Sequence, residues 1–269
     1  MAVAAETPSG SRPRADVDIP VKHLTLDDPW RWIAAGWRDM WAMPGISLAY
    51  GAVFSLISVS LAYALFASGL SSLVLALSAG FMLVGPLLAV GLYEASRRLE
   101  ANEPVRLGDV LFVDTASPAQ LAFLGGLLML VLLGWMRIAS LLFALFFGLD
   151  GFPPLADFLP TLMFTAHGLG LVVVGTSVGA LIAFFVFAIS ALSVPLLMDR
   201  EMDAVSAMLA SVRVVRQNPG PMLLWAWIIA LVTAVGMVTF FVGMIVAFPV
   251  VGHATWHAYR SAIKGRPTT

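Results

Sequence analysis

The stretch from Asp28 to Arg98 decides the fold, and it opens with DPWRWIAAGWRDMWAMPG at residues 28–45. Asp28 followed by Pro29 is typical of a helix start. Apolar residues then recur at helical spacing until the pair Pro44-Gly45, and two long uncharged apolar runs follow. The stretch closes with YEASRR at residues 93–98. This order predicts a helix on the membrane surface, a transmembrane hairpin and a basic anchor.

The composition places the whole chain in a membrane. Of 269 residues, 60% are hydrophobic and 12% are charged, and the mean hydropathy is +0.92. A soluble domain carries about a quarter charged residues, so this chain cannot cover a surface that faces water. The fold class that we expect is therefore all-α, a polytopic transmembrane helix bundle. The net charge of -1 gives no basic excess for nucleic acid.

The chain contains no cysteine. Disulfides, thiolate metal sites, iron–sulfur clusters and a cysteine nucleophile are therefore excluded. Residues 1–24 lack the apolar core of a signal peptide, so we expect a mobile cytoplasmic tail there, with the first span acting as an uncleaved insertion signal. We assign residues 25–264 to one membrane domain and 265–269 to a second tail.

About 20 apolar residues cross the hydrocarbon core of a bilayer. The sequence predicts spans over Ser47–Gly69, Ser72–Tyr93, Ala119–Phe147 and Leu169–Met198. Pro221–Tyr259 contains no Asp, Glu, Lys or Arg and is too long for one crossing, so it predicts a hairpin that turns near Gly236. The total is six spans, with five as the alternative if this segment crosses once. The segments 100–118 and 199–217 predict a second and a third surface helix, and residues 148–168 predict a loop on the far side.

The distribution of charge gives the orientation. With six spans, every one of the 15 Lys and Arg residues except Arg137 lies on one side. By the positive-inside rule this side is the cytoplasm, which predicts a bacterial inner-membrane protein with both termini cytoplasmic. Tryptophan gathers at the same side. The membrane-interface anchors that we expect are Trp30, Trp37, Trp41, Arg97, Arg98, Trp256 and Arg260.

The opening stretch has a counterpart near the end of the chain. When Pro44-Gly45 is aligned with Pro219-Gly220, Arg38 meets Arg213. When Pro86 is aligned with Pro249, Tyr93 meets Trp256 and Arg97 meets Arg260. Both copies start and end on the same side, so the pattern predicts a parallel internal repeat. The repeat-like units are 28–98, 105–198 and 199–260, of which the middle one departs most from the pattern.

Two histidines suggest a metal site. His253 and His257 stand at i and i+4, on one face of the last span, and Glu94 occupies the position that matches His257 in the first unit. The simpler interpretation, which we favour, is a pair of interfacial histidines that hydrogen-bond headgroups and carbonyls.

Arg137 is the single formal charge inside a predicted span, and intramembrane charges are functional candidates. Together with Glu94 and His257 it gives the candidates for a substrate path. The favoured alternative is an interface anchor whose long side chain reaches towards Asp150 or Asp157. Gly175 and Gly179 predict a helix-packing seam, and Pro86, Pro195 and Pro249 predict kinked spans. We find no catalytic constellation and no cofactor site.

The run SVPLLMD at residues 193–199, continued through Ala210-Ser211 to Asn218-Pro219-Gly220, resembles a bacterial integral membrane family called domain of unknown function 2189. Pro44-Gly45, Gly85-Pro86 and the 93–98 anchor resemble the same family, so the likeness extends over about residues 25–264. Members of this family are often labelled cytochrome c oxidase subunit I-like. The oxidase core needs histidine ligands on several spans, whereas this chain has four histidines in total. What the label implies here is association with a respiratory complex.

Three functions follow as hypotheses. The first is a non-enzymatic accessory, scaffold or assembly subunit that packs against another membrane protein, against a second copy or against lipid. The second is a small-solute or lipid transporter built on parallel repeats. The third, and least favoured, is a haem- or metal-binding protein that uses His253 and His257.

Overall fold

The computed structural model describes residues 19–70, 72–148 and 155–263, and within them the fold is a helix bundle. The only β-pairing in these ranges is an isolated bridge between Val21 and Ile263. The helices are α1 (Asp28–Ala42), α2 (Pro44–Ala67), α3 (Ser72–Leu88), α4 (Val90–Glu100), α5 (Leu107–Leu111), α6 (Pro118–Phe147), α7 (Leu155–Phe164), α8 (Ala166–Ser190), α9 (Ser193–Asp199), α10 (Ala204–Gln217), α11 (Pro219–Val238) and α12 (Met244–Ala262).

Five helical segments are long and apolar enough to cross a membrane. They are Pro44–Ala67, Leu73–Glu100, Pro118–Phe147, Ala166–Asp199 and Pro219–Val238. The second combines α3 with α4, which meet at Ala89 three residues after Pro86, and the fourth combines α8 with α9. The prediction of an all-α polytopic bundle is confirmed.

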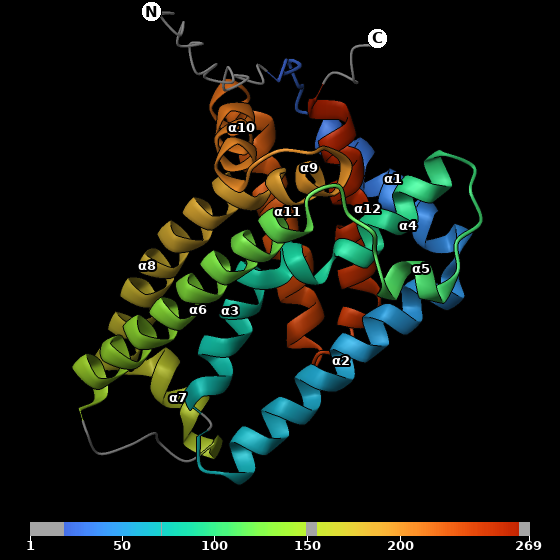
Figure 1. Ribbon diagram of the computed structural model, residues 1–269. Helices are drawn as coiled ribbons and strands as arrows, with labels where there is room; N and C mark the ends of the chain where they lie inside the picture. The colour runs from blue at the N-terminus through green and yellow to red at the C-terminus, as the bar shows by residue number, and fades with distance from the viewer. Residues whose placement is uncertain (1–18, 71, 149–154, 264–269) are drawn as a thin grey trace, which may run out of the picture.

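The chain returns to its starting side at the end. Helices α11 and α12 form the expected hairpin, with a turn at residues 239–243 that lies a little after Gly236. Helix α12 is less apolar than the five spans because it carries His253, His257 and Arg260. Its last turn lies beside the start of the described chain, where the Lys22 N–H donates to the Ala262 carbonyl at 2.9 Å. Figure 1 shows the first described residues and the end of α12 on one side of the bundle. Residues 221–259 thus form two helices joined by a turn, of which only α11 counts among the five candidate spans, so the total of six spans stays a prediction.

Helix α1 has two apolar faces with different surroundings. Trp32, Ala35 and Met40 are buried against the bundle. Trp30, Trp37 and Trp41 lie on the other side with about half of their surface exposed (57%, 47% and 52%). The N-cap is Asp27, one residue before the predicted one, and the Asp28 carboxylate accepts the Thr25 N–H at 2.7 Å instead. An exposed row of indoles on a surface helix is the arrangement expected at a membrane interface.

Three spans begin in the same way. Met43, Ser117 and Asn218 each precede a proline at the first helical position, and their φ/ψ angles are -139/62, -135/65 and -130/56. The residue before proline is driven out of the α region, so the chain turns sharply from a surface segment into a span. These three similar junctions add support to the predicted repeat, which stays a prediction.

Four local predictions need correction. Residues 19–24 do not extend freely, because Ile19 is buried and the Leu24 N–H donates to Asn218 Oδ1 at 2.8 Å. The predicted loop 148–168 contains a helix, α7, which is apolar despite Pro160. The second surface helix is reduced to α5, which has 5 residues. The third begins at Ala204, because Asp203 caps it by accepting the Ser206 N–H at 2.9 Å.

The closest helix packing is at α12, which lies against both α1 and α2. A Cβ atom at Gly36 would collide with Val250 and Ala254, and one at Gly51 would collide with the backbone of Ile245. Pro249 has no N–H to give the Ile245 carbonyl one turn earlier, and Gly51 of α2 approaches that same carbonyl. Two glycines therefore fix how closely the first and last helices of the chain pack.

Candidate functional site

A chain of five polar side chains links four helices near the side that holds both ends. Ser47 Oγ of α2 lies 3.0 Å from Nε2 of His253 in α12, and Nδ1 of the same ring lies 2.8 Å from Oγ of Ser96 in α4. Ser96 donates to Oδ2 of Asp39 in α1 at 2.7 Å. The same Oδ2 atom lies 2.8 Å from Nε2 of His257. We call these five residues the α1–α12 polar chain.

The acceptors determine where the protons lie. A carboxylate only accepts, so Ser96 gives its single proton to Asp39 and must accept from His253. The Nδ1 atom of His253 therefore carries a proton. In a neutral ring the Nε2 atom then accepts from Ser47, and the Nε2 atom of His257 donates to Asp39. Every one of these side chains is satisfied by another, which is what a buried polar group requires.

Burial decreases from one end of the polar chain to the other. Ser47, Ser96 and His253 have no exposed surface, whereas the side chains of Asp39 and His257 are 17% and 27% exposed. Burial raises the pKa of the Asp39 carboxyl, but hydrogen bonds from His257 and Ser96 outweigh it, so the pKa lies below its ordinary value. Asp39 is therefore held ionised near the surface of the bundle.

The order serine, histidine, serine, aspartate has the proton directions of a catalytic relay. A nucleophile also needs access to a substrate. Ser47 has no exposed surface, and neither of the two pockets described below is lined by it. What the arrangement does is join α1, α2, α4 and α12 through charge-assisted hydrogen bonds.

Glu94 forms a separate ionic cluster. Its carboxylate is 4% exposed and accepts from Arg97 Nε, Arg97 Nη2 and Arg98 Nε, each at 2.7 Å. Arg98 also lies 3.3 Å from Asp109 of α5. Three N–H donors pair the carboxylate of Glu94, so the guanidinium groups of Arg97 and Arg98 point towards this buried residue.

The structure separates the candidate metal ligands. Both ring nitrogens of His253 face serine hydroxyls, and the one contacted nitrogen of His257 faces Asp39. Among residues 19–70, 72–148 and 155–263 there is no group of three or more His, Cys, Asp or Glu side chains able to hold a metal ion. The i, i+4 pair instead supplies hydrogen bonds to three different helices.

The candidates for a substrate path do not come together. Glu94 and His257 lie in the two networks on the side of the termini, whereas Arg137 is an exposed residue well along α6. No ion pair joins Arg137 to Asp157 in the described part of the chain, and Asp150 lies outside it. Gly179 packs against Trp135 of α6, whereas the nearest atom to a Cβ at Gly175 belongs to Leu171 of the same helix, so only Gly179 lies at a contact between helices.

The predicted anchors divide into two groups. Trp30, Trp37 and Trp41 are exposed on α1, and Arg260 is exposed while lying 3.1 Å from Glu100. Trp256 is 1% exposed, and its Nε1–H donates to Glu100 at 3.1 Å. Its ring packs against Tyr259 rather than facing headgroups.

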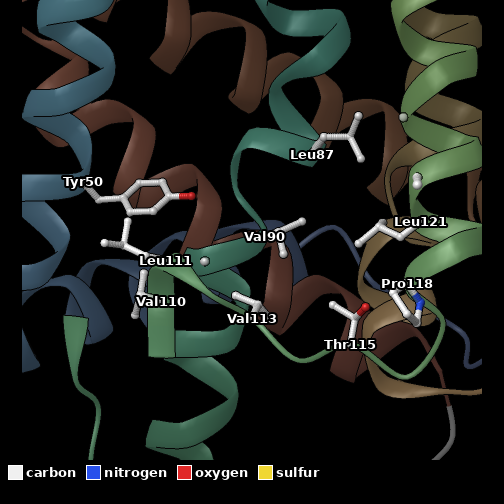
Figure 2. A pocket seen from close by; sticks show the side chains of 12 residues that line it. Tyr50, Leu87, Val90, Val110, Leu111, Val113, Thr115, Pro118 and Leu121 are labelled. Carbon is white, nitrogen blue, oxygen red and sulfur yellow. The ribbon is translucent and has the colours of Figure 1, made fainter. Parts of the chain in front are cut away.

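Two pockets lie where a surface segment meets the start of a span. The first, of about 500 Å³, lies between α2, α4, α5 and α6. Figure 2 shows Tyr50 on one side of it and Pro118 and Leu121 on the other, with Leu87 and Val90 between them. The second, of about 360 Å³, lies between α8, α10 and α11. Pro118 lines the first pocket and Pro219 the second, and each begins a span.

Sequence reasoning missed Asp39, Ser47 and Ser96. They come from three helices, and each looks like an ordinary polar residue when only its own helix is considered. The usable signal was small polar residues within apolar helices, since buried hydroxyls need partners. Asp39 carried a further signal, because it stands two residues from both Trp37 and Trp41 and therefore on the opposite face of α1 from these exposed indoles.

Residues 73–199, from α3 to the end of α9, match a protein family described as predicted integral membrane protein, DUF2189. This part of the chain is similar to that family. The resemblance inferred from the sequence is confirmed over these residues, which include Gly85-Pro86, the 93–98 anchor and the run 193–199. Ser96 and Glu94 lie within the matched residues, whereas Asp39, Ser47 and both histidines of α12 lie outside them. No curated protein and no solved structure matches the chain.

Proposed function

We propose that this integral membrane protein is a non-enzymatic accessory subunit that packs against another membrane protein in a bacterial inner membrane. Both of its termini lie in the cytoplasm. The proposal rests on the outer half of α2, residues 56–67. This part of the apolar helix follows Ser55, the last buried residue of α2, and none of its side chains is buried.

Helix α2 packs along α12 only over its first half. Its buried residues are Ser47, Gly51 and Ser55, and the Ser55 hydroxyl donates to the Phe241 carbonyl in the α11–α12 turn at 2.8 Å. The remaining 12 residues of α2, 56–67, extend about 18 Å past that turn at the rise of an α-helix. Figure 1 shows this part of α2 standing apart from α6 and α8.

The surface that α2 presents there is large and apolar. Leu56 is 67% exposed, Ile57 55% and Tyr63 74%. Helices α3, α6 and α8 pack on one another over the same depth. A membrane helix gains packing free energy when another helix lies against it, since contact with lipid gives no hydrophobic driving force. The outer half of α2 is therefore the part of the bundle best placed to receive a partner helix.

Site-directed photo-crosslinking in cells tests the proposal. A benzoyl-phenylalanine probe is placed at Val59 or Tyr63 of α2, and a control probe at Leu141 of α6, which is 69% exposed and lies well along its span. We expect the α2 probes to give one discrete heavier protein adduct that the Leu141 probe does not give. Purification from mild detergent is expected to bring the same protein in a stoichiometric amount.

Two results would argue against an accessory role. One is the absence of a protein adduct from every probe on residues 56–67 while the chain is correctly inserted. The other is an adduct pattern shared by α2 and the α6 control, which would indicate random collisions. An adduct of twice the mass of the chain would identify the partner as a second copy.

A further inference from the structure

The second pocket is an apolar groove with a single cationic residue at its rim. Its walls are Phe184 and Ala188 of α8, Val212 and Val215 of α10, and Pro219 and Leu223 of α11. Arg216, in the last turn of α10, is the only charged residue among the lining residues. No acidic side chain lines the groove, so its rim favours an anion.

The groove continues into the membrane as an exposed apolar track. On α11, Trp227 stands one turn after Leu223, and the two side chains are 67% and 50% exposed. On α8, Leu181 is 72% exposed and lies one turn before Phe184. Helices α8 and α11 diverge in this direction (Figure 1). An extended hydrocarbon chain that enters between Ala188 and Pro219 therefore meets apolar side chains on both sides.

The depth of the groove matches the boundary between headgroups and acyl chains. Helix α10 is a surface helix that ends at Gln217, and Pro219 begins the span α11. Arg216 is thus level with the start of a span, which is where the phosphates of a leaflet lie. Val205 and Leu209, on the exposed side of α10, are 54% and 61% exposed, as expected of a helix that rests on the membrane.

The corresponding place beside α1 is closed, which shows that the groove is not a necessary result of the fold. There α1 and α2 meet α12, and Gly36, Gly51 and the Ser47–His253 hydrogen bond bring the helices into direct contact. Among their described residues, helices α8, α10 and α11 have no such glycine contacts with one another. Gly220 of α11 has Leu26 as its nearest neighbour, and Leu26 belongs to none of these helices.

We propose that this groove binds one phospholipid, with an acyl chain between α8 and α11 and the phosphate diester against Arg216. Arginine suits this ligand because its planar guanidinium donates to phosphate oxygens in pairs. The apolar walls select a molecule with a long chain, so inorganic phosphate alone does not satisfy the site. The inference is independent of the proposed partner of α2, because the two surfaces are formed by different helices.

Native mass spectrometry of the full chain, purified from cells and exchanged into a mild detergent, tests the proposal. Phosphatidylglycerol is added back as the probe. We expect the wild-type chain to retain one phospholipid and Arg216→Ala to weaken retention about fivefold, as one arginine near a phosphate surface is worth. Ala188→Phe fills the groove without changing charge and is expected to abolish retention.

Two control variants separate the effect of the groove from the general effects of a lost charge or an added bulky side chain. Arg38→Ala removes an exposed arginine from α1, where the equivalent place is closed, and Ala64→Phe adds the same bulk to an exposed position of α2, a helix that does not line the groove. Both should retain lipid as the wild type does. The proposal is overturned if Arg216→Ala and Ala188→Phe retain lipid unchanged, or if Arg38→Ala loses as much as Arg216→Ala. Displacement of the lipid by inorganic phosphate at millimolar concentration would overturn it as well.

Discussion

The Nε2 atom of His257 lies 2.8 Å from Oδ2 of Asp39, and this contact joins the last helix of the chain to the first. Asp39 is also the acceptor for Ser96, which accepts in turn from His253. One carboxylate on a surface helix therefore fixes the position of α12 and of the end of α4. The packing of α1, α2, α4 and α12 therefore depends on the α1–α12 polar chain as well as on apolar contacts.

Removal of the Asp39 carboxylate should destabilise the protein strongly. Asp39→Ala leaves the Ser96 hydroxyl and the His257 N–H without their acceptor, and hydrogen bonds to a charged group are worth about 1.5–3 kcal/mol each. We expect the free energy of unfolding to fall by about 3 kcal/mol, which a lower thermal unfolding temperature in detergent would report. Arg31→Ala is the control on the same helix: it removes an ion pair whose arginine is 72% exposed, and the change should stay below about 1 kcal/mol. Equal losses in the two variants would contradict a special role for the polar chain.

The same residue predicts how stability depends on pH. The pKa of Asp39 is lower in the folded protein than in an unfolded chain, where it is about 3.9. Its stabilising contribution is therefore complete above this value and is lost as the pH falls through the lower folded pKa. Unfolding temperatures measured from pH 6 down to pH 2 should fall less steeply for Asp39→Ala than for the wild type. Parallel curves for the two proteins would show that Asp39 makes no such contribution.

The approach of α2 to α12 should not tolerate a single added carbon. In Gly51→Ala the new Cβ collides with the backbone of Ile245, and neither backbone can move without its helix. We therefore expect the free energy of unfolding to fall by about 1–3 kcal/mol. Gly126→Ala is the matched control on α6, because nothing lies within 4 Å of its Cβ position. That variant should be neutral or should gain up to about 1 kcal/mol from helix propensity. The measurement is again thermal unfolding, and a neutral Gly51→Ala would show that the helices are further apart.

The purified protein should contain no stoichiometric metal or haem bound by α12. Both ring nitrogens of His253 are already engaged with Ser47 and Ser96, so no lone pair remains for a ligand bond. Metal analysis and an absorption spectrum check this, and treatment with EDTA should leave the unfolding temperature unchanged. One equivalent of metal that disappears in His253→Gln would contradict the hydrogen-bond assignment.

The sequence was sufficient for those elements that local rules determine. The helix near Asp28 and the ends of the surface helices at Pro44-Gly45 and Pro219-Gly220 could be predicted, because proline restricts the residue before it and apolar spacing marks a helix. The structure adds that the same prolines begin α2 and α11. Helix α7 was missed because Pro160 and the surrounding residues looked like a loop. The many Leu and Phe residues between Leu155 and Phe164 were a better indication of a helix than Pro160 was of a loop.

The polar chain could not be predicted in the same way. Its members are up to 218 residues apart, and their meeting depends on how α1, α2, α4 and α12 pack in three dimensions. The spacing of His253 and His257 was read correctly as one helical face. The partners on that face were supplied by other helices, which turned a candidate metal pair into hydrogen-bond donors and acceptors. Glu94 was likewise noticed, but only the structure shows that Arg97 and Arg98 occupy its carboxylate.

The orientation of the bundle underlies the proposed surfaces, and cysteine labelling measures it directly because the chain contains no cysteine. Leu26→Cys and Arg260→Cys mark the side of the chain ends, and Ser68→Cys marks the opposite turn between α2 and α3. A membrane-impermeant maleimide is applied to spheroplasts before and after the membrane is opened. We predict that only Ser68→Cys reacts while the membrane is intact and that the other two react once it is opened. Labelling of Leu26→Cys or Arg260→Cys in intact spheroplasts would contradict the account.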